Sequence, residues 1–288
     1  MKTIIFKKKS IMLVTILAIV SAVFFVGCGG TSGNEEVQND ETVLKGTISM
    51  AGSTSVQPLS EELAAIFMQQ HSNVRLEVAG GGSSAGPKSV VSGAAEIGAA
   101  SREIYPEELE NVDSFVIAID GIAVIVNAAN PINNISFENV QQIFRGEITN
   151  WSEIDGADKD IVVVNREEGS GTRGAFHELV VGKDNEFVNT AIIQNSTGAV
   201  REAVANDANA VGYISLGGIN DSIKPLKVDG VQPVVEEIRA GKYPIARPFN
   251  YVVKKGAQLS AAAQAFIDFV LSDEGQKVVK DNGFVPIK

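Results

Sequence analysis

Glycine, serine and threonine gather beside an arginine in the middle of this chain, in the segment Asn-Arg-Glu-Glu-Gly-Ser-Gly-Thr-Arg at 165–173. The apolar run 161–164 before it predicts a buried strand, and the pattern at 174–181 after it predicts a helix. Such a turn points backbone N–H groups and hydroxyls at one place, at the positive end of the helix dipole. Arg166 adds a planar guanidinium that suits a tetrahedral oxyanion. The segment therefore predicts an anion site.

Two further turns repeat this arrangement, at 51–58 and at 80–87. Each follows a predicted strand and begins a predicted helix, and Pro58 stands in a first helical turn, where its missing N–H costs nothing. Any one of these turns alone is explained by helix capping. Three together favour a ligand site, because ligands of open α/β sheets bind at the carboxyl ends of strands. The candidate contacts in these two turns are Ser53, Thr54, Ser55, Ser83 and Ser84.

Two charged residues near these turns have alternative interpretations. Arg102 follows the predicted strand 97–99, and it either supplies a second cation to the site or pairs with Glu103 or Glu107 on the surface. Glu168 stands two residues after Arg166, so we expect it to hold that guanidinium in place, as supporting carboxylates do. The alternative for Glu168 is a solvated acid in a turn.

Motifs for catalysis and for metal binding are missing from the sequence. The chain has two histidines, no H-E-x-x-H and no G-x-S-x-G, and its single cysteine lies near the start, outside the mature domain. The segment 81–89 is similar to a phosphate-binding P-loop, but Pro87 breaks the required spacing. We therefore expect no enzyme activity, no metal and no cofactor. A triad that uses His177 is the weak alternative.

The first 27 residues predict an export signal. Four lysines precede a 16-residue apolar run at 11–26, which is short for a membrane span and typical of a signal peptide. Cys28 follows directly and resembles the lipobox cysteine of bacterial lipoproteins, which is diacylated; an ordinary signal peptide with a chance cysteine is the alternative. Residues 28–45 are polar and acidic, which predicts a flexible tether to the membrane.

Net charge excludes one class of partner. The chain carries a net charge of −11, and without residues 1–27 it keeps 20 basic against 35 acidic residues, a net charge of −15. We therefore expect no nucleic-acid binding. An anionic ligand would have to be held by local dipoles and one or two arginines against the overall field.

The alternation of apolar runs with amphipathic segments predicts an α/β fold. Long apolar or strand-like stretches at 114–126 and 244–253 are candidates for crossings between two lobes, with a ligand cleft and a hinge between them. Lobe I would then comprise 46–125 plus 248–288, and lobe II 126–247. The predicted strands are 46–51, 74–78, 97–99, 161–164 and 211–215, and the predicted helices are 57–70, 87–92, 137–151 (helix and turn), 174–181, 198–205, 260–271 and 273–281.

Taken in order, these segments resemble the PstS-type phosphate-binding lipoproteins of phosphate ABC transporters, in the periplasmic-binding-protein superfamily. The segments that carry the resemblance are 51–55, 82–86, 97–102, 143–151, 166–172 and 212–214. The resemblance implies a two-lobed fold that buries phosphate and performs no chemistry. It implies phosphate contacts at Thr54, Ser55, Ser83, Ser84, Arg166, Ser170, Gly171 and Thr172. Well-known members carry an aspartate where this chain has Arg102, and that aspartate accepts the proton of bound phosphate.

The sequence thus predicts a monomeric, extracytoplasmic protein, anchored by lipid at Cys28, that captures inorganic phosphate and delivers it to an ABC permease. An alternative is the same fold with another oxyanion, such as sulfate, molybdate or tungstate. A second is a secreted hydrolase of phosphate esters, and a third is a scaffold that has lost its ligand.

Overall fold

The computed structural model describes residues 43–288. The predicted signal peptide 1–27, Cys28 and most of the predicted tether 28–45 lie outside the described residues. Among residues 43–288, no helix combines the length and the apolar character that a membrane span requires.

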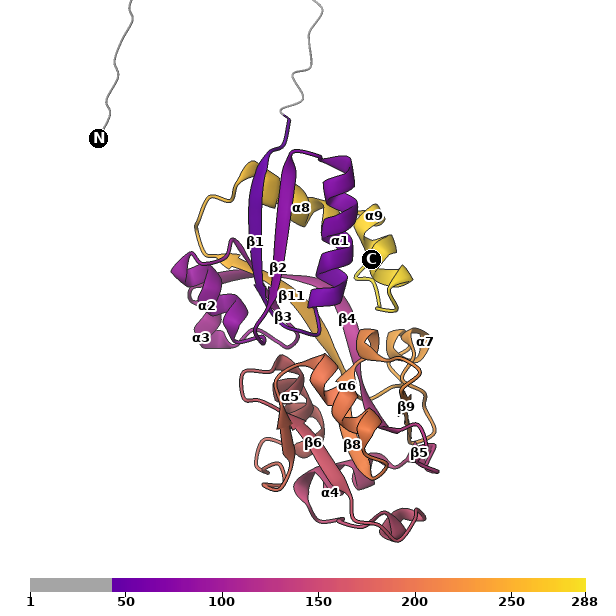
Figure 1. Cartoon of the computed structure of the whole chain (residues 1–288). Helices are drawn as coiled ribbons and strands as arrows, with labels where there is room; N and C mark the ends of the chain where they lie inside the picture. The colour runs from indigo at the N-terminus through magenta and orange to yellow at the C-terminus, as the bar shows by residue number, and fades with distance from the viewer. Residues whose placement is uncertain (1–42) are drawn as a thin grey trace, which may run out of the picture. The chain divides into compact units, whose positions relative to one another are not determined.

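A long mixed sheet runs through the described part of the chain, with the strand order β2-β1-β3-β11-β4-β8-β6-β7. Its central strands are β4 (Val112–Asn127) and β11 (Ala246–Lys254), which pair antiparallel. The first part of β4 pairs with β11, and its second part pairs with β8 (Ala210–Ser215). These two strands therefore carry the chain from one half of the molecule to the other (Figure 1).

The half that contains both ends of the described chain, lobe I, is built on the parallel strands β1 to β3. Helix α1 forms because Leu59, Leu63 and Phe67 share one face, which packs into the core. The C-terminal helices complete this core. The elements of lobe I besides β4 and β11 are β1 Gly46–Gly52, α1 Gln57–Gln70, β2 Val74–Gly80, α2 Ala85–Ser92, β3 Ile97–Ala100, α3 Pro106–Leu109, α8 Ala261–Leu271 and α9 Asp273–Asp281.

Lobe II holds a core of its own, with aromatic side chains at its centre. The ring of Phe176 stacks on that of Tyr213 with 4.0 Å between centroids, and Phe144 packs edge-on against both. The elements of lobe II are β5 Asn134–Ile135, α4 Phe137–Arg145, the 3-10 helix Trp151–Ile154, β6 Val162–Arg166, α5 Gly171–Phe176, the π-helix His177–Val181, β7 Ile192–Gln194, α6 Thr197–Asn206, β8, the 3-10 helix Leu216–Gly218, β9 Ile223–Pro225, β10 Lys227–Val228 and α7 Val235–Arg239.

Each crossing strand packs into the core of lobe I over one part of its length and into the core of lobe II over the other. On β4, Ala118 belongs to the core of lobe I and Ile122 to that of lobe II. On β11, Phe249 packs in lobe I, and Ile245, just before the strand, packs in lobe II. The predicted limits 46–125, 126–247 and 248–288 stay a prediction at the level of single residues.

The predicted helices 57–70 and 273–281 match the observed bounds of α1 and α9. Helix α5 begins three residues earlier than the predicted 174, because the Ser170 hydroxyl accepts from the N–H of Arg173 and caps it. The observed helix α4 is shorter than the predicted helix and turn 137–151. It ends at Arg145, because Gly146 adopts a φ of +79°.

Candidate anion-binding site

The first turn, between β1 and α1, contributes three hydroxyls. Ser53 and Ser55 are buried, and Ser53 Oγ accepts from the N–H of Ser55 (3.2 Å), which fixes the turn. Gly52 permits the strand end to approach β3, since a β-carbon at its φ of +144° would lie 2.1 Å from the carbonyl oxygen of Ala99. The turn therefore lies at the carboxyl end of β1, next to that of β3.

The second turn, between β2 and α2, reaches across to lobe II. The N–H of Ser84 donates to the carbonyl oxygen of Gly169 (3.1 Å). Gly82 has a φ of +83°, and a β-carbon there would lie 2.9 Å from the same oxygen. Ser83 is fully buried, and its Oγ lies 3.2 Å from Ser101 Oγ and accepts from the N–H of Ser101 (2.9 Å).

The third turn, between β6 and α5, meets the first two. Thr172 Oγ1 lies 2.9 Å from Ser55 Oγ across the lobes. A β-carbon on Gly171 would lie 2.2 Å from Ser83 Oγ, so the backbone of this turn touches the second turn directly. Ser170 caps α5 and is buried. The turns singled out in the sequence are thus gathered in one buried cluster, as expected.

A fourth turn completes the cluster, and sequence reasoning missed it. Thr197, the first residue of α6, has its Oγ1 2.8 Å from Ser55 Oγ, and its N–H donates to Thr54 Oγ1 (3.3 Å). The signal was present, because Ser196, Thr197 and Gly198 follow the apolar pair Ile192 and Ile193 and precede a helix. The strand β7 is three residues long and exposed, which weakens its pattern.

Arg166 lies inside the cluster with 2% of its surface exposed. Its Nη2 donates to Thr54 Oγ1 (3.4 Å), and its Nε and Nη2 donate to the carboxylate of Glu167 (2.8 and 2.9 Å). The expectation for Glu168 needs correction here: the supporting carboxylate is Glu167, because at this strand end it is the side chain of Glu167 that meets the guanidinium.

Arg102 is buried but engaged by its own lobe. Its guanidinium makes a bidentate pair with Glu108 (2.8 Å each) and lies 3.7 Å from the ring centre of Tyr105. The acid is neither Glu103 nor Glu107, since α3 turns Glu108 back toward the loop. A contact between Arg102 and an anion stays a prediction.

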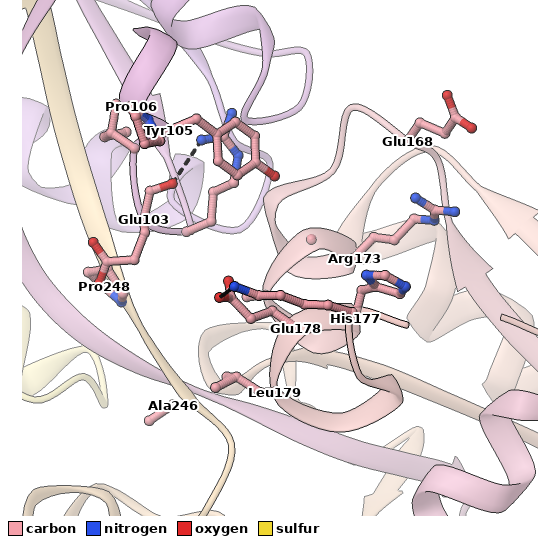
Figure 2. Close-up of a pocket in the computed structure, with 15 residues that line it drawn as sticks. Glu103, Tyr105, Pro106, Glu168, Arg173, His177, Glu178, Leu179, Ala246 and Pro248 are labelled. Atoms are coloured by element: carbon pink, nitrogen blue, oxygen red, sulfur yellow. Dashed lines mark hydrogen bonds and ion pairs between the residues drawn. The ribbon is translucent and has the colours of Figure 1, made fainter. Parts of the chain in front are cut away.

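Arg102 also lines a cavity of about 630 Å³ between the lobes. Figure 2 shows Glu103 and Tyr105 on one side of it and Arg173, His177 and Glu178 on the other. No serine or threonine of the four turns lines this cavity, so it is distinct from the hydroxyl cluster. His177 Nε2 lies 2.7 Å from the carbonyl oxygen of Asn185, and Glu168 lies at the cavity wall.

A buried ion pair beneath the cluster was also missed. Arg247 Nε and Nη2 donate to Asp120 Oδ2 (3.2 and 3.0 Å), and both residues are buried. Burial raises the pKa of Asp120 to about 6 although Arg247 lowers it. Burial lowers the pKa of Arg247, Asp120 raises it, and the neighbouring Arg166 lowers it further.

This arrangement suits the binding of an anion. Hydroxyls, helix N-termini and a guanidinium all favour an anion. Within residues 43–288, no group of three or more histidine, cysteine or acidic side chains is placed to hold a metal ion.

The chain is similar in sequence and structure to known phosphate-binding proteins. Residues 37–274 match the family model of the PBP superfamily domain. The chain is 29% identical to the phosphate-binding protein PstS of Bacillus subtilis (strain 168), over 97% of this chain and 95% of that protein. It is 31% identical to PstS of Borreliella burgdorferi, over 84% of this chain and 90% of that protein.

Among solved structures, a phosphate ABC transporter substrate-binding protein of Clostridium perfringens, with bound phosphate, is 40% identical and superposes with a TM-score of 0.82. The match covers 84% of this chain and all of that chain. A phosphate transport receptor of Vibrio cholerae is 33% identical, with a TM-score of 0.68 over 83% of this chain and 99% of that one. The two-lobed fold expected from the sequence is thus confirmed, and the chain belongs to the PstS family of phosphate-binding proteins within the PBP superfamily.

Proposed function

We propose that this chain binds inorganic phosphate in the four-turn cluster and delivers it to an ABC permease. The observation that carries the proposal is the 2.9 Å contact between Ser55 of lobe I and Thr172 of lobe II, beside the buried Arg166. Hydroxyls from both lobes meet at one point, so a ligand held there is enclosed when the lobes close. The similarity to PstS proteins and to phosphate-bound structures supports this ligand.

Many modest hydrogen bonds supply the affinity. Each bond to a charged oxyanion contributes about 1.5–3 kcal/mol, so a handful suffices for micromolar binding after the cost of closure. The overall negative charge does not prevent binding, since the donors act locally and the site is screened from solvent. The proposed phosphate contacts are Ser53, Thr54, Ser55, Ser83, Ser84, Arg166, Ser170, Gly171 and Thr172, with Thr197 added from the structure.

The role we propose is binding without catalysis. A phosphate-ester hydrolase would need a base next to a nucleophilic hydroxyl. His177 instead lies beside the separate cavity, with its Nε2 against the Asn185 carbonyl. This placement favours a transport role over the hydrolase alternative.

We also propose that the protein works outside the cytoplasm, tethered to the membrane through a lipid on Cys28, as a monomer. The signal-like segment 1–27 and the polar segment 28–45 support the export and the tether in this proposal. The permease would then meet a binding protein held close to the membrane surface.

Selectivity is where this chain departs from well-known relatives. The resemblance to PstS proteins implies an acceptor for the phosphate proton, which distinguishes phosphate from sulfate, and it places Arg102 at that acceptor's position. Glu108 already neutralises Arg102, so Arg102 does not by itself turn the site toward a fully ionised oxyanion. We therefore retain phosphate as the ligand.

Calorimetric titration of the chain from Gly29 onward tests this assignment, with phosphate, sulfate and molybdate between pH 6 and 8. We expect micromolar or tighter phosphate binding that sulfate does not reverse at comparable concentration. Displacement of phosphate by equal sulfate or molybdate would assign the site to another oxyanion.

A further inference from the structure

The buried pair Asp120–Arg247 occupies a special place in the fold. Asp120 lies on β4 between Ala118 and Ile122, where the strand passes from one core to the other. Arg247 lies opposite it on β11, and the two are register partners. The pair thus joins the crossing strands at the point about which the lobes must move.

The same pair reaches into both lobes. Arg247 Nη1 donates to the carbonyl oxygen of Ser101 (2.9 Å), at the end of β3 in lobe I. Asp120 Oδ1 accepts from the N–H of Leu216 (3.2 Å), in lobe II. One chain of hydrogen bonds therefore runs from lobe II through the crossing strands to Ser101.

Ser101 is the centre of the hydroxyls on the lobe I side. Ser53 Oγ donates to Ser101 Oγ (2.8 Å), and Ser83 Oγ lies 3.2 Å from it. Ser101 is fully buried, and a β-carbon on Gly171 would come within 2.9 Å of its hydroxyl. A shift of the Ser101 backbone would therefore move the hydroxyls of the first and second turns together.

We propose that Asp120 and Arg247 are positioning residues for the anion site, which set the Ser101 hydroxyl, and through it those of Ser53 and Ser83, in register with lobe II. The inference rests on the proposed phosphate site. Neither side chain needs to touch the anion, because the guanidinium acts through the Ser101 carbonyl.

The energetics favour such a role over simple stabilisation. Two charges buried together lose so much hydration that an ion pair of this kind adds little to stability compared with apolar side chains. The Arg247 guanidinium, in contrast, donates from two nitrogens to one Asp120 oxygen and from its third to the Ser101 carbonyl oxygen, which fixes its orientation. A site gains affinity when its groups are held in place before the ligand binds. Asp120 also offsets the repulsion between Arg247 and the nearby Arg166.

A double-mutant cycle tests the inference on the chain from Gly29 onward, by phosphate calorimetry. Arg247→Lys keeps the positive charge and loses the guanidinium group with its several directed N–H donors. Asp120→Asn keeps the shape of the side chain and loses its negative charge. Each is measured alone and combined with Ser101→Ala, which removes the hydroxyl and keeps the carbonyl. Tyr251→Phe is the matched control. Tyr251 lies on β11, as Arg247 does, and the substitution removes a buried hydrogen bond of 2.7 Å to Ser60, away from the anion site.

We expect Arg247→Lys and Asp120→Asn each to weaken phosphate binding at least tenfold in the parent chain, and less than about threefold once Ser101 is alanine. Tyr251→Phe should lower the melting temperature and leave affinity within twofold. If Arg247→Lys and Asp120→Asn reduce phosphate affinity by the same factor in the Ser101→Ala background as in the parent chain, the pair acts independently of Ser101 and the inference is wrong. Failure of both variants to fold would also overturn it. A parent chain that binds no phosphate would instead refute the proposed function.

Discussion

A methyl group at Gly171 should separate the lobes without harming either of them. A β-carbon there would lie 2.2 Å from Ser83 Oγ and 2.8 Å from Ser83 Cβ, on the opposite lobe. Ser83 is fully buried and cannot turn away into solvent. In Gly171→Ala the turns must therefore move apart.

The size of the effect follows from the contacts that are lost. Restoring an ordinary contact of about 3.4 Å requires a shift of roughly 1 Å. The Ser55–Thr172 contact would lengthen from 2.9 Å, and the Ser84–Gly169 bond from 3.1 Å, both to about 4 Å, which is beyond hydrogen-bond range. Two such bonds at about 1 kcal/mol each, together with the loss of one contact to the anion at about 1.5–3 kcal/mol, sum to about 3.5–5 kcal/mol and predict roughly a 400- to 5,000-fold loss of phosphate affinity.

Calorimetry measures the affinity, and urea unfolding measures the stability. The folding of lobe II should be unchanged or slightly improved, because alanine favours a helix more than glycine does. Gly198→Ala is the matched control: it also stands in the first turn of a helix of the cluster, but a β-carbon there meets nothing within 4 Å. Wild-type affinity in Gly171→Ala, or an equal loss in Gly198→Ala, would refute the reasoning.

Three further predictions concern buried charges and the location of the protein. Arg166→Ala removes a buried cation from the cluster and should weaken phosphate binding by about 1.5–3 kcal/mol, roughly 10- to 150-fold; an effect within twofold in calorimetry would favour a scaffold that has lost its ligand. Burial raises the pKa of Asp120 from 3.8 to about 6, so the folded chain takes up a proton at higher pH than the unfolded chain, and the stability that Asp120 contributes is present in full below about pH 4 and lost as pH rises through about 6. Asp120→Asn should remove up to about 3 kcal/mol of this pH dependence in urea unfolding; parallel pH profiles of the two proteins would contradict it. Cys28→Ser should move the expressed full-length chain from the membrane to the soluble extracytoplasmic fraction in immunoblots, and retention in the membrane would rule out the lipid anchor.

The turns of the site could be predicted from local sequence, because three separate turns rich in glycine, serine and threonine each end an apolar run and begin a helix. The segments 51–58, 80–87 and 165–173 are predicted in this way. Hydroxyls of the first and third segments meet directly, and Ser83 of the second is joined to Ser53 through Ser101. Thr197 could not be predicted in this way, because the strand before it, β7, is short and exposed. The sequence of β7 therefore resembles that of a loop.

Partners in space could not be predicted in the same way. Asp120 and Arg247 lie 127 residues apart, and nothing in either local pattern indicates the other. Glu167 and Glu168 are adjacent acids in one turn, and the backbone direction at the end of β6 decides which of them meets Arg166. Arg102 shows the same limit, since only the path of α3 brings Glu108 to it.

A crystal structure of the chain from Gly29 onward, grown with phosphate, would show where the anion binds. We expect one buried phosphate that receives hydrogen bonds from the four turns and from Arg166 at once. Phosphate bound in the cavity beside Tyr105 and Arg173, or a phosphate held by a single lobe, would contradict it.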